Sequence, residues 1–163
     1  AEGFSAVKFD PAGQYTVYDG RMPDLEAIAQ SVAFCREIRA AVGDRADMLF
    51  GTHGQFTAAG ALRLARQLEP FDPLWFEEPC PPDMPEEMAK VAAGTSIPVA
   101  TGERLCSKFE FARVLDLGAA AILQPDLGRA GGILEGKKIA AMAETRYVQV
   151  APHLYCEIGR AHV

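Results

Sequence analysis

The chain has 163 residues, of which 49% are hydrophobic and 23% are charged. This composition excludes a disordered chain and is typical of one globular domain with a sizeable core. The formal net charge of −6, without clusters of Lys or Arg, argues against nucleic acid and anionic membranes as partners. No segment reaches transmembrane length and no signal peptide precedes Ala1, so we expect a soluble, cytoplasmic protein.

Strand and helix patterns alternate along the whole chain. Short apolar runs predict strands at residues 6–10, 47–51, 74–77, 98–101, 120–123 and 147–151. Apolar residues at helical spacing predict helices at about 25–42, 58–68, 85–93, 108–115 and 132–143. Asp24 and Thr57 are suited to cap the first two helices, and Pro85 fits the first turn of the third. Four cysteines without a Cys-x-x-Cys pair favour reduced thiols over a disulfide framework.

The strands are apolar throughout rather than alternating, which is typical of a parallel sheet buried on both faces. Polar residues follow five of these strands at intervals of 23 to 27 positions, namely His53, Glu77, Glu103, Asp126 and His153. Such regular spacing favours strand ends that face one mouth, as in a (β/α)₈ barrel. A doubly wound sheet would carry a Gly-rich phosphate turn after its first strand, and none is present. We therefore predict an α/β fold, a partial TIM-type barrel of about six βα units.

Two adjacent acids end the third predicted strand, in the run Leu74-Trp75-Phe76-Glu77-Glu78-Pro79. Side chains alternate along a strand, so Glu77 is expected to point inward and Glu78 to face the helix layer or the rim of the mouth. Glu77 and Glu103, at neighbouring strand ends, could be ordinary salt-bridged acids. They could also hold Mg²⁺, which prefers carboxylate oxygens and leaves room for oxygens of a substrate.

Asp126 and His153 form a candidate pair in which the carboxylate fixes the imidazole tautomer and makes the histidine a general base. An incidental pair is the alternative. Lys8 is the only basic strand residue expected to point to the mouth, where it could neutralise an acidic pocket or take part in catalysis.

A set of short motifs occurs in the order seen in the mandelate racemase subgroup of the enolase superfamily, and the chain resembles that family over nearly its whole length. The motifs are Lys8-Phe9-Asp10, Glu77-Glu78-Pro79, Gly102-Glu103-Arg104-Leu105, Gln124-Pro125-Asp126 with Gly131-Gly132, and Pro152-His153-Leu154. The resemblance implies the second to seventh strands of the family's barrel, without its capping domain. It also implies homo-oligomers at full length.

The resemblance implies roles for individual residues. Glu77 and Glu103 match two metal ligands, and Asp126 with His153 matches the family's base dyad. Gly51 stands where the family usually has an Asp ligand. His53 matches the histidine that protonates the departing hydroxyl in acid-sugar dehydratases such as galactonate or mannonate dehydratase; it could instead replace the missing ligand.

The implied activity is that of a Mg²⁺-dependent hydro-lyase acting on a sugar acid, with proton transfer by His153 and His53. Lys8 and Arg104 would hold the substrate carboxylate or neutralise charge. Lys8 matches the first lysine of the family's pair, whereas Asp10 replaces the second. A racemase or cycloisomerase, a Schiff-base aldolase using Lys8, and a metal-poor relative without catalysis stay open as alternatives.

Both ends of the chain look artificial. Residues 1–156 are expected to be the barrel fragment, inactive by itself and exposing two bare sheet edges. Residues 157–163 are expected to be a non-native tail, because 158–163 can be back-translated as ATC GGA AGA GCA CAC GTC, which resembles a sequencing adapter.

Overall fold

The computed structural model describes residues 3–12 and 20–154. The predicted tail at 157–163 lies outside these residues, as does Cys156. In the described ranges no helix is long and apolar enough to cross a bilayer.

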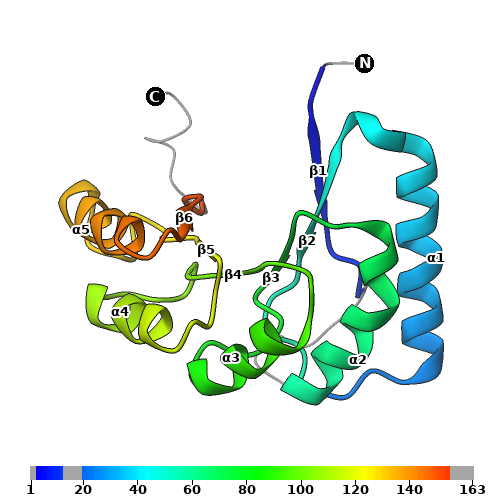
Figure 1. Cartoon of the computed structure of the whole chain (residues 1–163), viewed down its shortest axis with the longest axis horizontal. Coiled ribbons are helices and arrows are strands. Elements are labelled where there is room, and N and C mark those ends of the chain that lie inside the picture. The colour runs from blue at the N-terminus through cyan, green and yellow to red at the C-terminus, as the bar shows by residue number, and fades with distance from the viewer. Residues whose placement is uncertain (1–2, 13–19, 155–163) are drawn as a thin grey trace.

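Six parallel strands form one sheet in which each strand pairs with its neighbour in sequence, in the order β1-β2-β3-β4-β5-β6 (Figure 1). A doubly wound sheet would reverse this order at one point, whereas an arc of a barrel keeps it. The predicted partial barrel is therefore confirmed. The strands are β1 (Ala6–Phe9), β2 (Asp47–Gly51), β3 (Trp75–Glu77), β4 (Val99–Thr101), β5 (Ile122–Leu123) and β6 (Gln149–Val150).

Helices connect the strands and follow one another around the outside of the sheet (Figure 1). Asp24 and Thr57 cap α1 and α2 as expected, with side chains that accept bonds from the backbone N–H of Ala27 and Gly60. The helices are α1 (Leu25–Val42), α2 (Ala58–Leu68), α3 (Pro85–Gly94), α4 (Lys108–Asp116) and α5 (Ile133–Glu144), with short 3₁₀ turns η1 (Gly43–Arg45) and η2 (Glu69–Phe71).

The last strand begins later than the sequence predicts. Tyr147 was expected to open it, but this residue has φ 56° and is 99% exposed. Its backbone N–H binds the carbonyl of Glu144, so the residue belongs to the turn that ends α5. The apolar pattern therefore predicted too early a start for β6, because apolar character does not reveal a left-handed turn.

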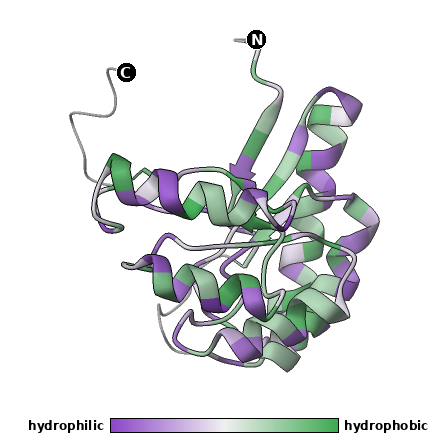
Figure 2. Ribbon diagram, turned by 60° about the vertical axis from the view of Figure 1, so that its left-hand side comes forward, coloured by the Kyte–Doolittle hydropathy of each residue, from purple (hydrophilic) through white to green (hydrophobic). Residues whose placement is uncertain are grey.

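The core lies between the sheet and the helices. Phe50, Phe76 and Val99 occupy adjacent positions in the register of β2, β3 and β4, and all three are buried in the main hydrophobic cluster. Figure 2 shows hydrophobic and hydrophilic residues interleaved along the helices, as expected where one side faces the sheet. Since side chains alternate along a strand, Lys8, Gly51 and Glu77 share the opposite, concave face.

Two phenylalanines of α4 provide a test of this core. Phe111 is fully buried and Phe109 is 74% exposed. We expect Phe111→Ala to lower the free energy of unfolding of the intact protein by about 3–5 kcal/mol, because it leaves a cavity. Phe109→Ala should change it by less than about 0.5 kcal/mol. Urea unfolding of both variants would measure the difference, and equal losses would contradict this placement of the core.

Candidate active site

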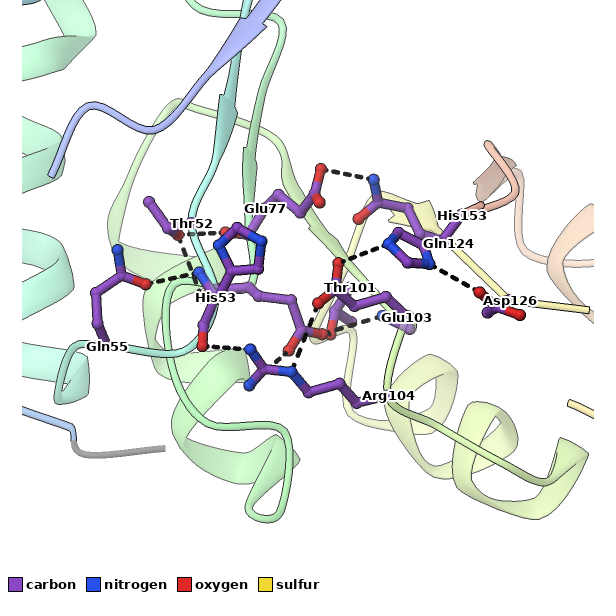
Figure 3. Close-up of polar contacts among 12 residues, drawn as sticks. Thr52, His53, Gln55, Glu77, Thr101, Glu103, Arg104, Gln124, Asp126 and His153 are labelled. Carbon is purple, nitrogen blue, oxygen red and sulfur yellow. Dashed lines mark hydrogen bonds and ion pairs between the residues drawn. The ribbon is translucent and has the colours of Figure 1, made fainter. Parts of the chain in front are cut away.

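The carboxylate of Glu77 lies at the end of β3 and is fully buried. Its Oε1 accepts from Lys8 Nζ at 2.6 Å, and its Oε2 accepts from Gln124 Nε2 at 2.8 Å and from Trp75 Nε1 at 3.2 Å. A buried carboxylate is tolerated only when it is paired and hydrogen-bonded, and these three donors meet that need. Figure 3 shows the Glu77 carboxylate beside the side-chain amide of Gln124.

Two further acids, Glu103 and Glu78, lie beside Arg104, whose side chain is only 7% exposed. Its Nε lies 3.5 Å from Glu103 Oε1, and its Nη1 lies 3.8 Å from Glu78 Oε2. Its Nη2 donates to the carbonyl oxygen of His53. Arg104 thus neutralises two buried acids and also fixes the loop that carries His53; its role at the substrate stays a prediction.

Glu78, expected to face the helix layer or the rim of the mouth, is fully buried. Its Oε1 accepts from the hydroxyl of Thr101 and from the N–H of Gly102 at 3.2 Å. Burial raises the pKa of Glu78 to about 7; the hydrogen bond from Thr101 lowers it, and the charge of Glu103 raises it further. This carboxyl therefore titrates near neutral pH.

The backbone at the end of β3 is held in an unusual conformation. Glu78 has φ 41°, which is uncommon for a residue with a side chain. Its carbonyl oxygen accepts from Gly54 N at 2.7 Å, and the Thr52 hydroxyl donates to the carbonyls of both Glu77 and Glu78. These bonds hold the turn that sends Glu77 and Glu78 to different sides.

His153 and Asp126 lie together at the ends of β6 and β5. His153 Nδ1 is 2.9 Å from Asp126 Oδ2, and Nε2 is 3.5 Å from Glu103 Oε2. Burial would raise the pKa of Asp126, but hydrogen bonds from His153, Gly128 and Arg129 outweigh it and lower that pKa. An ionised Asp126 makes Nδ1 the protonated nitrogen, which leaves the Nε2 lone pair directed toward Glu103.

His53 lies in the loop after β2. Its backbone N–H donates to Gln55 Oε1 at 2.6 Å, and its Nδ1 lies 4.0 Å from Asp10 Oδ2. Burial raises the pKa of Asp10, against opposing bonds from Ala12 and Gln55. In the view of Figure 3 the rings of His53 and His153 lie on either side of the Glu103 carboxylate.

Several residues that hold the site received no role from the sequence. All but Trp75, which opens β3, lie at a strand end or in the loop that follows it, where a polar residue ends an apolar run, and this signal could have identified them. They are Thr52, Gln55, Trp75, Thr101 and Gln124.

A divalent cation fits part of this arrangement. Glu103 Oε2 is buried without a hydrogen-bond partner among the described residues, which is a need that a cation would meet. Glu77 and Glu103 supply the hard oxygen donors that Mg²⁺ prefers. Gly51 supplies no third ligand, and within 3–12 and 20–154 no cluster of three or more His, Cys, Asp or Glu side chains has the geometry to hold a metal. Two residues, Glu77 and Glu103, are therefore available to supply oxygen ligands to a divalent cation.

Parallel strands in sequential order, with acidic and histidine side chains at their carboxyl ends, define the barrel class of α/β enzymes. Residues 1–163 match the family described as Enolase C-terminal domain-like, and the chain belongs to this family.

Individual relatives agree with this assignment. A D-galactonate dehydratase from Ralstonia nicotianae is 44% identical over 98% of this chain. A protein from Labrenzia alexandrii DFL-11, solved as a candidate mandelate racemase/muconate lactonizing enzyme, is 70% identical with a TM-score of 0.92 over 95% of this chain. A mandelate racemase/muconate lactonizing enzyme-like protein from Roseovarius sp. TM1035 is 66% identical, with a TM-score of 0.91 over 94%. The chain spans 39–40% of the length of these relatives. Membership of the family implies a divalent metal.

The position of Arg104 leads to a stability prediction. Arg104→Met should lower the free energy of unfolding by about 3 kcal/mol, because it leaves Glu78 and Glu103 buried without their counter-charge. Adding Glu78→Gln should restore part of the loss, since it removes one of the two charges. Urea unfolding of the intact protein at pH 8 would measure both. Two independent, additive losses would contradict this role for Arg104.

Proposed function

We propose that the intact protein is an acid-sugar dehydratase, which removes the proton α to a carboxylate and eliminates the β-hydroxyl to give a 2-keto-3-deoxy sugar acid. One observation carries the proposal: a histidine with a fixed tautomer lies beside the buried carboxylate of Glu103 at a strand end, and a second histidine lies on the other side of that carboxylate in the view of Figure 3. The similarity to a D-galactonate dehydratase supports the same reaction class.

His153 is the proposed base. Asp126 holds its Nδ1–H at 2.9 Å, so Nε2 carries the lone pair that accepts the α-proton. Asp126 also stabilises the imidazolium that forms. Nε2 lies 3.5 Å from Glu103 Oε2, so the base faces the carboxylate pair where the substrate would lie.

His53 is the proposed acid that protonates the β-hydroxyl as it leaves. The Asp10 carboxylate lies 4.0 Å from its Nδ1. Gln55 binds both the backbone N–H of His53 and the side chain of Asp10 and so keeps acid and partner together. Elimination by two groups requires His153 neutral and His53 protonated, which gives a bell-shaped pH profile.

Glu77 and Glu103 would hold Mg²⁺. When bound, the ion would lower the free energy of the negative charge that develops on the substrate carboxylate. Lys8 contributes a positive charge at the same carboxylate, and Arg104 supports the site through Glu103 and the His53 carbonyl. A racemase would need a second base, and Asp10 replaces the lysine that the family's pair would supply.

The two histidines can be tested separately. In D₂O, His153→Asn should abolish both exchange of the α-hydrogen and formation of the keto acid, by about 100-fold or more. His53→Asn should lose keto-acid formation by a similar factor but keep α-exchange, because its role follows proton removal. Proton NMR of a panel of sugar acids with the intact protein would follow both signals.

Loss of α-exchange in His53→Asn would place His53 at the metal or the substrate instead of at the leaving group. Titration with Mg²⁺ separates these two cases, because only a ligand's loss weakens cation binding. A wild type that exchanges the α-hydrogen and inverts its configuration without elimination would favour the racemase.

A further inference from the structure

The side chain of Lys8 crosses strand β2 at Gly51. Lys8 lies on β1 and Glu77 on β3, and β2 stands between these two strands. Gly51 pairs with Glu77 in register, and Lys8 pairs with Leu49, two positions earlier on the same face of β2. To reach Glu77, the lysine side chain must therefore pass over β2.

The absence of a side chain at Gly51 makes this crossing possible. A Cβ atom at residue 51 would lie 2.6 Å from Lys8 Cε and 3.3 Å from Lys8 Cγ. Contacts this short force the lysine to move. Gly51 does not have a positive φ, so its backbone does not require glycine. The space above Gly51 is thus occupied by the lysine stem.

We propose that the ammonium of Lys8 is the resident counter-cation of Glu77 and competes with a divalent ion for that carboxylate. Gly51 makes this contact possible because it leaves space for the lysine side chain. The proposal rests on the metal site of the proposed function. Gln124 and Trp75 already bind Glu77 Oε2, and Lys8 binds Oε1 at 2.6 Å. A divalent ion that uses Oε1 must displace the ammonium.

The displaced lysine side chain can move into solvent. Its side chain is 45% exposed, whereas Glu77 is fully buried, so the ammonium can swing toward the mouth without losing solvent. There it becomes available to a substrate carboxylate. Cation loading would then precede tight binding of the sugar acid, and Lys8 would serve Glu77 in one state and the substrate in the other.

Mn²⁺ binding to the intact protein tests this competition. Binding is measured as the loss of the free-ion signal in electron paramagnetic resonance. Lys8→Met should tighten Mn²⁺ binding by about tenfold, because the competitor is removed. Gly51→Ala should tighten it to a similar extent although it adds no ligand and changes no charge, because its Cβ displaces Lys8 from Glu77. In the double variant the second substitution should add nothing.

Lys108→Met is the matched control, because it removes a lysine that is paired with Glu135 on α5 instead of Glu77. It should leave the affinity within about twofold of wild type. Mn²⁺ binding that appears only in the Lys8 and Gly51 variants supports the competition. Unchanged or weaker binding in Lys8→Met, additive effects in the double variant, or no binding in any variant overturns it.

Sugar-acid turnover by the same samples separates this inference from the proposed function. Tighter binding in Lys8→Met without turnover in wild type refutes the dehydratase and keeps the competition. Turnover in wild type with equal Mn²⁺ affinities in all variants refutes the competition and keeps the dehydratase.

Discussion

The burial of three carboxylates at two neighbouring strand ends is the constraint on which the site depends. Glu77 and Glu78 are fully buried and Glu103 nearly so. Buried charges of one sign repel, and the fold can hold them only by supplying counter-charges or protons. Lys8 serves Glu77, Arg104 lies between Glu78 and Glu103, and burial shifts Glu78 toward its neutral form. Among the described residues, Glu78 Oε2 and Glu103 Oε2 have no hydrogen-bond partner, and Glu103 Oε2 lies 3.5 Å from His153 Nε2.

Local backbone features distribute these charges. The positive φ of Glu78 turns its side chain away from Glu77, so that adjacent acids face different counter-charges. At Gly102, with φ 132°, a Cβ would lie 2.7 Å from Phe111, so only glycine fits where β4 turns into the segment that carries Glu103 and Arg104. The helix-side core thus fixes the position of a carboxylate on the mouth side, which links packing to chemistry.

The strand ends could be predicted because an apolar run followed by a polar residue recurs along the chain, and parallel strands bring those residues to one edge. The pairing of His153 with Asp126 follows from this rule. The contact of Lys8 with Glu77 does not, because it joins strands that are not neighbours and depends on an absent side chain at Gly51. The bond from Arg104 to the His53 carbonyl depends on loop geometry, and Glu78 is buried through a left-handed turn that residue type does not reveal.

Anomalous diffraction from crystals of the intact protein grown with Mn²⁺ tests most directly whether this edge of the sheet is a cation-dependent active site. The account predicts one manganese peak bound by a carboxylate oxygen of Glu77 and one of Glu103, at about 2.0–2.3 Å, on the side that faces His153, with Lys8 Nζ moved away from Glu77. Electron density with Lys8 still on Glu77 and no peak between the two carboxylates would contradict it.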